Sequence, residues 1–559
     1  MNHSRWNLLP PAPENLVSAS AFPPLIAQLL YNRGLIEPSQ SELFIAGDKR
    51  LSSDPLLLPD MHQAVARVYR ALLSGETIAI YGDFDADGIT ATALLVQGLS
   101  AIGAKTVPYI PHRMTEGYGL NTTALESLHQ QGVTLVITVD CGITALPQIK
   151  KARRMGLDII VTDHHTALPE VPPAVAVVDP KLPHSAYPFS ELTGVGVALK
   201  LIQALLHSLG KEELLDDLAD LVAIGTIADV APLLGENRYL VKQGLRLMNS
   251  SPRLGIRKMI TQAGLTIGSL DTDSISWTIA PRLNAAGRLE HAMSSYKLLM
   301  TDSPQEAQEL SIWLEQKNTE RQKLTSSVLA KAREQILGQE ISFLLVAGDK
   351  DYPVGIAGLV AGRLAEEFYR PTIVVRVGEQ MSSGSCRSIP DFNIILALNQ
   401  CSNLLTRFGG HSQAAGFTLP TKNLPRLHQA LLQLATSQLA GVDLRSHLDI
   451  DAEVALPQFI GETFQMMQKL APFGRGNPLP AFLSRAVEVV DCRSMGNGRE
   501  HLRLKLRQGG TVWGGVGFGL GGFLAEVTSP LDIVYNLEVD RWSGEERLRL
   551  NILDFAPAK

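Results

Sequence analysis

The sequence predicts an α/β protein with two α/β lobes followed by a small β-barrel. Strand-like and helix-like segments alternate over residues 51–235, which is the pattern of a parallel sheet with helices on both faces. A second stretch with the same alternation covers residues 339–445. Over residues 446–559 the chain changes to short strands separated by glycine-rich turns, which is typical of a small barrel.

The length and composition indicate a globular protein of several domains. A chain of 559 residues is too long for one hydrophobic core, so roughly three or four domains are expected. No run of about 18 uncharged apolar residues predicts a membrane span. The N-terminus has no apolar signal segment and the four cysteines lack CxxC spacing, so we expect a cytoplasmic protein without structural disulfides or a zinc ribbon. The net charge of −6 at pH 7 does not decide which class of substrate the protein binds.

The chain begins with a lead-in, residues 1–50, which contains several prolines and one predicted helix over residues 24–33. This lead-in carries no recognisable chemistry. The first lobe follows, and the isoleucine-containing run 77–81 predicts a buried strand. The apolar run 89–100 predicts a helix, so the loop between the two lies where open α/β sheets bind their ligands.

This loop carries three carboxylates, Asp83, Asp85 and Asp87. Acids this close repel one another unless a cation neutralises them, so the loop predicts a divalent-metal site. A calcium loop of the EF-hand type is excluded, because its twelfth position needs a glutamate and is Leu94 here. A solvated acidic turn remains open for the loop taken alone.

Further acids and histidines stand at later strand ends. The predicted strand 134–139 ends at Asp140, and the strand 157–162 ends at Asp163-His164-His165. In a parallel sheet these ends lie along one edge, so their side chains converge with the acidic loop. Taken singly, an aspartate after a strand is more often a helix cap or a turn former.

One more acid stands in apolar surroundings. Asp229 comes near the end of the apolar segment 214–230, where an acid usually has a partner or a metal. Mostly oxygen ligands with one or two imidazoles favour Mn²⁺ or Mg²⁺ over zinc, and the supply is large enough for two ions.

The region 236–338 has a helical pattern. Ser303 to Glu306 forms a capping box with proline at the first helical position, and an unbroken, largely polar helix is predicted from there to Gly338. A helix of this length would span roughly 50 Å. We expect it to connect the two lobes, although a surface helix is an equal alternative.

The loop 83–88, the turn 140–142 and the triplet 163–165 together resemble the DHH phosphoesterase superfamily. Other segments narrow the resemblance to the RecJ family of bacterial single-stranded-DNA-specific exonucleases. They are 116–119, 227–233 with Asp229, 281–288, 384–388 and 409–411. The likeness runs from about residue 50 to the C-terminus. Phe84 and His112 depart from the family pattern, which more often has tyrosine and Asp or Asn there, but neither is a ligand.

The resemblance implies a centre with two ions. Asp85 would bind the first ion, Asp140 would bridge the two ions, and Asp83 would support the ligands of the first ion. The second ion would take Asp87, His164 and Asp229. His165 would lie beside the scissile phosphate, so Asp83, Asp140 and His165 are the predicted catalytic residues. A bridging carboxylate holds two ions about 3.5 to 4 Å apart, which suits water attack on phosphorus without a covalent intermediate.

Candidate DNA-binding residues come from every part of the chain. Arg113 stands in a loop that also contains an aromatic residue and two glycines. Arg288 shares a predicted loop with Arg282 and Asn284, and ordinary surface charge is the alternative interpretation of these three residues. In the second lobe, loops of small residues supply Ser385, Arg387 and His411, although such loops are often ordinary turns. The RecJ likeness implies that these side chains contact phosphate.

The barrel carries a basic stripe. Alternation over residues 499–507 places Arg503 and Lys505 on one face and leucines on the other. With Trp513 and Phe518 nearby, the pattern fits an OB-like surface that follows a DNA backbone and stacks bases. A solvated outer face is the alternative.

We therefore expect a DHH lobe and a DHH-associated lobe around a cleft, joined by a long helix and followed by an OB-like barrel. The resemblance implies a 5′-to-3′ exonuclease of single-stranded DNA in repair, recombination and mismatch repair. It also implies a single-stranded-DNA-binding protein and a helicase as partners, and we expect a monomer. A DHH phosphohydrolase of short oligonucleotides or cyclic dinucleotides is an alternative that would not need the basic barrel. A non-catalytic replication scaffold is another, which would not need Asp85, Asp87 and Asp140.

Overall fold

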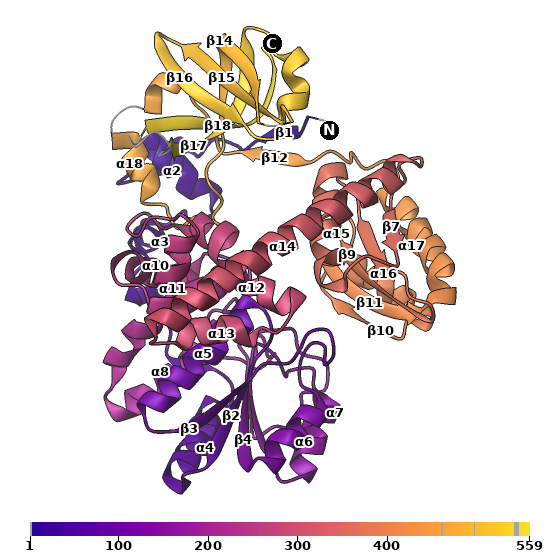
Figure 1. The fold of residues 1–559 in the computed structure, drawn as a ribbon. Helices are drawn as coiled ribbons and strands as arrows, with labels where there is room; N and C mark the ends of the chain where they lie inside the picture. The colour runs from indigo at the N-terminus through magenta and orange to yellow at the C-terminus, as the bar shows by residue number, and fades with distance from the viewer. Residues whose placement is uncertain (1–2, 460–461, 497, 541–546, 559) are drawn as a thin grey trace. The chain divides into compact units, whose positions relative to one another are not determined.

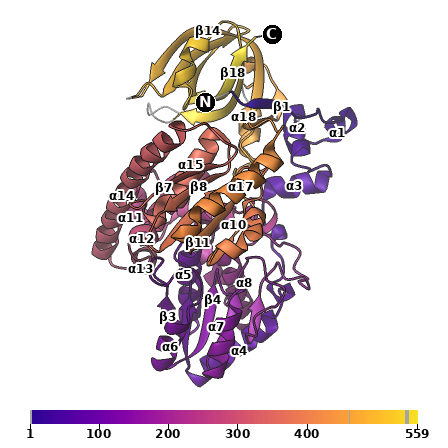
Figure 2. The same cartoon turned by 90° about the vertical axis from the view of Figure 1, so that its right-hand side faces the viewer.

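The computed structural model describes residues 3–459, 462–496, 498–540 and 547–558 (Figures 1 and 2). The chain divides into two compact units. The first unit contains residues 43–323 and 472–477, and the second contains residues 1–42, 324–471 and 478–559. No helix in the described part of the chain is both long and apolar enough to cross a membrane.

The first unit contains the predicted parallel sheet, in the order β3-β2-β4-β5-β6. Its strands are β2 (Thr77–Tyr81), β3 (Lys105–Tyr109), β4 (Val133–Val139), β5 (Asp158–Thr162) and β6 (Ala176–Val178). Alternate strand residues enter two different cores, because successive side chains point to opposite faces. Ile78 and Ile80 pack with helices α4 (Met61–Ser74), α5 (Ala86–Ala101), α8 (Gly194–Leu209) and α9 (Ala219–Ala228).

The opposite face of this sheet is covered by α6 (Thr122–Gln130) and α7 (Leu146–Arg154). Ala79 and Tyr81 pack on that side. Figure 1 shows α6 and α7 on one side of the strands and α5 and α8 on the other. All carboxyl ends of the strands therefore open onto one edge that is bordered by helices.

A group of helices completes the first unit. They are α10 (Gly235–Ser250), α11 (Leu254–Gln262), a π-helical turn η4 (Ser274–Ile279), α12 (Ala280–Leu289) and α13 (Met293–Met300). The long helix α14 (Pro304–Leu337) follows and confirms the predicted connection. Its Ala307 and Leu314 belong to the core of the first unit, and its Val328 and Ala332 belong to the core of the second. The Ser303 hydroxyl accepts from the Glu306 amide at 3.3 Å, as a capping box requires.

The second α/β lobe has a mixed sheet in the order β10-β11-β9-β8-β7. Only β7 (Leu345–Asp349) and β8 (Thr372–Arg376) run parallel, while β9 (Met381–Arg387), β10 (Arg407–Gly410) and β11 (Ala414–Pro420) are antiparallel. One face packs on α15 (Val354–Phe368) and the end of α14, and the other packs on α16 (Ile394–Gln400) and α17 (Leu424–Leu439). Figure 2 shows α15 and α17 beside these strands.

The predicted barrel is present. Its strands are β13 (Ala452–Glu453), β14 (Phe482–Met495), β15 (His501–Gln508), β16 (Thr511–Gly517), β17 (Leu531–Asp540) and β18 (Arg547–Pro557). An additional pairing of β14 with β17 closes the sheet. This pairing is interrupted between Ser484 and Val487, where a bulge bends the long strand. Phe459, Phe482 and Tyr535 pack together inside.

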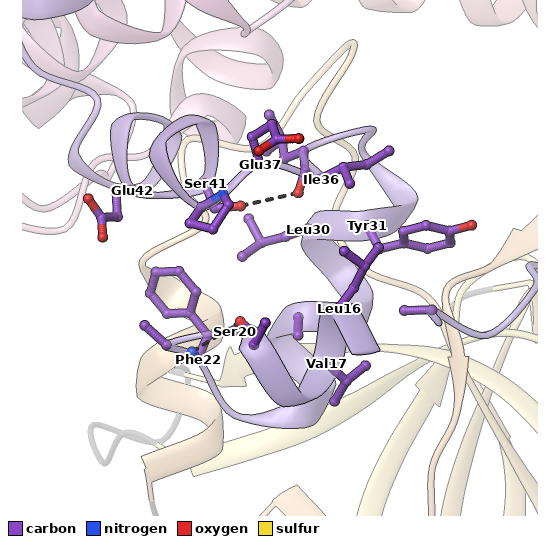
Figure 3. Close-up of a pocket in the computed structure, with 16 residues that line it drawn as sticks. Leu16, Val17, Ser20, Phe22, Leu30, Tyr31, Ile36, Glu37, Ser41 and Glu42 are labelled. Atoms are coloured by element: carbon purple, nitrogen blue, oxygen red, sulfur yellow. Dashed lines mark hydrogen bonds between the residues drawn. The ribbon is translucent and has the colours of Figure 1, made fainter. Parts of the chain in front are cut away.

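The lead-in folds onto the barrel side of the second unit. Its strand β1 (Arg5–Leu8) pairs in parallel with β12 (His447–Ile450), and the Trp6 indole donates to Asp554 at 2.9 Å. Helices α1 (Glu14–Ala19), α2 (Pro24–Asn32) and α3 (Pro38–Ala46) follow. They line a largely apolar pocket, where the Ser41 hydroxyl donates to the Leu35 carbonyl (Figure 3).

Candidate active site

The acidic loop is shaped by the start of α5. Asp85 is the N-cap of this helix, and its carboxylate accepts from the amides of Asp87 at 3.1 Å and Gly88 at 3.2 Å. A Cβ on Gly88 would lie 2.6 Å from the backbone nitrogen of Asp83, so only glycine fits there. The tight turn therefore places three carboxylates at the end of β2, as the sequence predicts.

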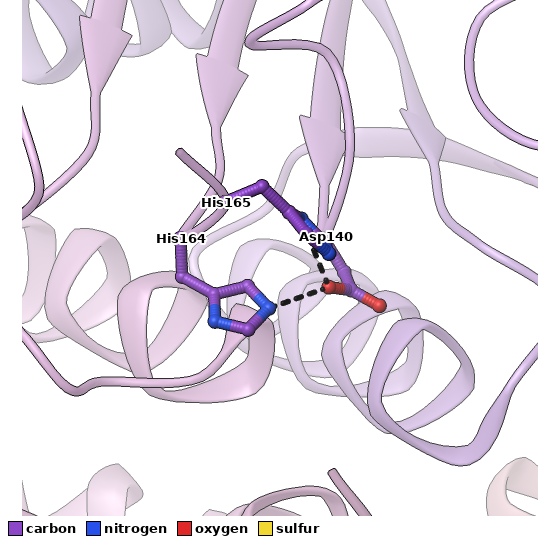
Figure 4. A group of neighbouring side chains, drawn as sticks. All are labelled: Asp140, His164 and His165. Carbon is purple, nitrogen blue, oxygen red and sulfur yellow. Dashed lines mark hydrogen bonds and ion pairs between the residues drawn. The ribbon is translucent and has the colours of Figure 1, made fainter. Parts of the chain in front are cut away.

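The next two strand ends bring the other predicted ligands to this loop. Asp140 follows β4 in the left-handed region, with φ of 60°. His164 and His165 follow β5, and Figure 4 shows both imidazole rings beside the Asp140 carboxylate. The nearest ring nitrogens lie 3.1 Å (His164) and 3.9 Å (His165) from its Oδ1 atom.

Three overlapping groups of side chains could each hold a cation. The ligand atoms within each group lie within 4.8 Å of one another. The groups are Asp83, Asp85 and Asp140; Asp87, His164 and Asp229; and Asp140, His164 and His165. Asp229 ends α9 and is the exposed member. Since Asp140 and His164 each belong to two groups, all six predicted metal ligands and His165 are brought together.

The electrostatics of the cluster fit a bound cation. Burial, followed by repulsion from neighbouring acids, raises the pKa values of Asp83, Asp87 and Asp140 well above the usual range. The Oδ1 atom of Asp83 is buried and has no hydrogen-bond partner in the described part of the chain. A buried carboxylate oxygen without a donor is costly unless a cation offsets it. Oxygen and imidazole donors in this number suit Mn²⁺ or Mg²⁺.

Asp163 supports the histidines from behind. Its Oδ1 atom accepts from the amides of His164 at 2.7 Å and His165 at 3.1 Å, and lies 2.7 Å from Nδ1 of His165. Its Oδ2 atom accepts from the Ile143 amide. Burial opposes the charged imidazole, but the hydrogen bond to Asp163 together with the negative charges of Asp163, Asp229 and Asp85 outweighs it and raises the pKa of His165 to about 9.

Arg113 lies beside the acidic loop. Its guanidinium carbon is 4.7 Å from the centre of the Phe84 ring. The loop that carries Arg113 is held by Glu116. The Glu116 carboxylate accepts from the Tyr109 hydroxyl at 2.5 Å, from the backbone amide of His112 at 2.6 Å and from the side-chain amide of Asn121 at 2.8 Å. Sequence reasoning named this loop but missed the role of Glu116.

Two more residues of this loop have roles that the structure makes visible. The Tyr118 hydroxyl lies 3.3 Å from the Asp140 carbonyl and 3.4 Å from Nδ1 of His165. The Nδ1 atom of His112 accepts from the amides of Met114 and Thr115 at 3.2 and 3.3 Å. Asp and Asn side chains make the same kind of bond to backbone amides, so His112 takes over a turn-forming role that those residues usually have.

The structure corrects the prediction of a loop around Arg288. Arg282, Asn284 and Arg288 lie on helix α12. This helix contacts the acidic loop, because the Asn284 side chain accepts from the Ala86 amide at 2.8 Å. A Cβ on Gly287 would lie 2.4 Å from the Phe84 carbonyl oxygen. Arg288 therefore directly follows a residue in close contact with the acidic loop. Arg282 forms an ion pair with Glu315.

Two of the three second-lobe candidates lie on a strand where a loop was predicted. Ser385 and Arg387 are alternate residues of β9, and both are half-buried. The Arg387 guanidinium lies beside α15, 3.1 Å from the position of a Cβ on Gly358. His411 is exposed at the tip of the β10–β11 hairpin, where its amide donates to Ala414 at 2.7 Å.

The barrel shows the predicted alternation, with one correction. On β15, Arg503 and Lys505 are exposed while Leu502, Leu504 and Leu506 are buried. Trp513 is only 8% exposed, so its ring cannot stack on a base, whereas Phe518 is 51% exposed. Trp513 lies opposite Leu506 in the strand register, which places it on the core side of the sheet.

Comparisons with known families cover most of the chain. Residues 77–226 match the N-terminal domain of the DHH family, residues 338–437 match the DHHA1 domain, and residues 450–554 match the RecJ OB domain. Each match coincides with one of the folded parts described above.

Characterised relatives match over nearly the full length. The single-stranded-DNA-specific exonuclease RecJ of Bacillus subtilis is 37% identical, over 99% of this chain and 71% of the relative. The same enzyme of Haemophilus influenzae is 32% identical, over 90% of this chain and 92% of the relative. The crystal structure of Thermus thermophilus RecJ with Mn²⁺ superimposes with a TM-score of 0.85 at 32% identity, over 99% of this chain and 80% of that one.

Proposed function

Because the chain belongs to the RecJ family of single-stranded-DNA-specific exonucleases, we propose that it degrades single-stranded DNA from the 5′ end, in the 5′-to-3′ direction. The enzyme is a metal-dependent exonuclease that uses Mn²⁺ or Mg²⁺. The observation that carries the metal-dependent chemistry is the Asp140 carboxylate, which shares one ligand group with Asp83 and Asp85 and another with His164 and His165. Its placement supports a centre of two ions.

Each ligand side chain has a definite place in the proposed centre. Asp83, Asp85 and Asp140 form one group, and Asp87, His164 and Asp229 form the other. When bound, the metal ions would polarise the phosphodiester and activate the attacking water. Asp140 belongs to the first group and lies 3.1 Å from His164 of the second, so it would bridge the two ions. His165, which is held by Asp163, would lie beside the phosphate. Water adds to phosphorus, the bond to the 3′-oxygen of the terminal nucleotide breaks, and that oxygen takes up a proton.

We propose that arginines hold the DNA. Arg113, stacked on Phe84 beside the acidic loop, is suited to grip the backbone near the reacting phosphate. Arg288, Ser385 and Arg387 are each a candidate to bind the terminal 5′-phosphate. His411 would contact the DNA, and Arg503 and Lys505 would follow the strand on the barrel. The exposed basic face of β15 supports the last assignment.

The setting is proposed on the family resemblance. We infer that the enzyme acts as a monomer in the cytoplasm, in DNA repair, recombination and mismatch repair. A single-stranded-DNA-binding protein would supply coated substrate, and a helicase would supply unwound strands.

End-labelled DNA tests the proposal. A single strand labelled at its 5′ end and the same strand labelled at its 3′ end are each incubated with the enzyme and Mn²⁺ or Mg²⁺, beside blunt duplex and a reaction with chelator. We expect early release of the 5′ label as a mononucleotide from the single strand only. Early release of the 3′ label would overturn the direction, and equal cleavage of the duplex would overturn the substrate.

A further inference from the structure

One short segment of the chain belongs to a different unit from its neighbours in sequence. Residues Pro472–Asn477 pack with the first unit, although residues 324–471 and 478–559 belong to the second. The segment is a closed hairpin. Gly474 and Asn477 exchange backbone hydrogen bonds at 2.8 and 3.1 Å, and the Asn477 side chain donates to the Pro472 carbonyl at 2.8 Å.

The hairpin is bound to the loop that follows Asp229. The Leu233 amide donates to the Arg475 carbonyl at 2.8 Å. In return, the Arg475 guanidinium donates to the carbonyl of Val230, the residue next to Asp229, at 3.4 Å. Two segments that are far apart in sequence are thus joined by hydrogen bonds at the edge of the candidate metal site.

A buried arginine fixes the start of the hairpin. Arg238 is fully buried in α10, and its guanidinium donates to the Pro472 carbonyl at 3.4 Å and to the Phe44 carbonyl at 2.6 Å. The guanidinium carbon of Arg238 lies 3.8 Å from the centre of the Phe44 ring. A buried cation with carbonyl partners on both sides resists displacement, because losing either partner leaves a charge without compensation.

The hairpin fits the loop closely. A Cβ on Gly474 would lie 2.8 Å from the Leu233 side chain, and a Cβ on Gly476 would lie 3.1 Å from the Leu234 side chain. Gly476 also has φ of 78°, in the left-handed region that favours glycine. Both glycines therefore allow the hairpin to approach Leu233 and Leu234 closely, and a larger residue at either position would separate the hairpin from the loop.

The loop beneath the hairpin adopts a conformation that needs support. Val230 has φ of 57°, which is unusual for a β-branched residue. Strained residues of this kind persist only where their surroundings impose the conformation, and they gather at functional sites. Here the strained residue directly follows Asp229, and its carbonyl is the acceptor for Arg475.

We propose that the hairpin Pro472–Asn477 positions Asp229 for metal binding, with Arg475 as a positioning residue. The inference rests on the proposed function, since it takes Asp229 to be a ligand together with Asp87 and His164. A segment that lies just before barrel strand β14 in sequence therefore holds the loop that carries the DHH-domain ligand Asp229. The family resemblance of the ligands says nothing about this contact.

A matched pair of glycine substitutions tests the proposal on the full-length protein. Gly476→Ala introduces a side chain at φ of 78° against Leu234 and Pro232. Gly156→Ala introduces the same side chain at φ of 79° with no atom within 4 Å. Both variants carry similar backbone strain in the first unit, and only Gly476→Ala displaces the hairpin. Asn477→Ala, which opens the hairpin without changing charge, is the second variant if Gly476→Ala fails to fold.

Mn²⁺ binding without DNA and amide exchange at Leu233 in metal-free protein are the two measurements. We expect Gly476→Ala to weaken one Mn²⁺ site by about tenfold, the effect usual for a support residue, and to speed exchange at Leu233. Gly156→Ala should match the parent in both. Equal Mn²⁺ affinity in the two variants would overturn the inference. Asp229→Ala distinguishes the ligand assignment from the role of the hairpin. If Asp229→Ala binds Mn²⁺ like the parent, Asp229 is not a ligand and the proposed centre fails. If Asp229→Ala loses an ion while Gly476→Ala binds Mn²⁺ like the parent, only the role of the hairpin fails.

Discussion

The Nδ1 atom of His165 lies 2.7 Å from Oδ1 of Asp163, a buried carboxylate that belongs to none of the ligand groups among the described residues. The same oxygen accepts from the backbone amides of His164 and His165. Asp163 therefore fixes both histidines without facing a cation itself. Side chains that orient ligands in this way are often as important to a metal centre as the ligands.

We predict that Asp163→Asn lowers kcat by about 10-fold to 100-fold, because such a substitution disturbs the orientation of the neighbouring histidines. KM for single-stranded DNA should stay close to that of the parent, since the Asp163 side chain is fully buried and is not available for direct DNA contacts. Steady-state kinetics with saturating Mn²⁺ measure both constants. A rise in KM with unchanged kcat would contradict this role.

Asp140→Ala should abolish hydrolysis while DNA binding is largely retained. The Asp140 carboxylate lies in one ligand group with Asp83 and Asp85 and in another with His164 and His165, so its loss disturbs the ligands of both proposed ions. Affinity for DNA comes mainly from cationic contacts with phosphates. Nuclease assays and filter binding on the same preparation measure the two properties. Activity within about tenfold of the parent would contradict a centre of two ions, in which the bridging ligand is essential.

Glu116→Gln should loosen the loop that carries Arg113. The amide keeps the shape of the carboxylate but replaces one acceptor oxygen with a donor, so the three donors around Glu116 can no longer all be satisfied. We expect kcat/KM to fall by about tenfold, the factor that corresponds to one lost hydrogen bond to a charged group. Glu116→Asp, which keeps the charge on a shorter side chain, shows whether charge or reach matters.

The same residue gives a pH dependence. Burial raises the pKa of Glu116, but hydrogen bonds from Tyr109, His112 and Asn121 outweigh it and leave the pKa below its usual value. Ionised Glu116 therefore stabilises the fold above its unfolded pKa of about 4.3, and this contribution is lost as the pH falls through the lower folded value. Urea unfolding between pH 3 and 6 should show a smaller loss of stability in Glu116→Gln than in the parent.

The main features of the site could be predicted because they follow from periodicity. Alternation and strand order place Asp83, Asp140 and His164 at one sheet edge whatever the details of packing. The α12 helix was not predicted, because Asn284 and Gly287 are poor helix formers and the helix is stabilised by its contact with the acidic loop. The docking of Pro472–Asn477 depends on contacts more than 230 positions away in sequence, which no local pattern contains.

Replacing Arg503 and Lys505 with alanine should weaken binding to long single strands. The salt dependence of binding should also become shallower, by roughly 0.7 in slope for each lost phosphate contact. Arg507→Ala is a matched control on the same face of β15, because Arg507 already pairs with Glu488 at 2.5 Å. Binding measured over a range of salt concentrations tests the difference. Equal slopes in the parent and the double variant would mean that this face is only solvated.

Selection of a DNA end requires a feature that internal phosphates lack. A terminal phosphate carries extra negative charge and free oxygens, and arginine can bind two phosphate oxygens at once. Arg288 is the candidate that directly follows Gly287, where a Cβ would lie 2.4 Å from the Phe84 carbonyl oxygen of the acidic loop. We predict that Arg288→Ala lowers kcat/KM on 5′-phosphorylated strands far more than on 5′-hydroxyl strands.

The size of this effect follows from the contact that is lost. A charge-assisted hydrogen bond contributes about 1.5 to 3 kcal/mol, so the preference for the phosphorylated end should fall by about tenfold to a hundredfold. Arg282→Ala is the matched control, since Arg282 lies on the same helix and its guanidinium is held by Glu315 at 2.5 Å. The ratio of kcat/KM on the two strands is measured for the parent and both variants. An equal loss on both strands in Arg288→Ala would show that Arg288 serves general binding or packing, and that another feature of the enzyme selects the 5′ end.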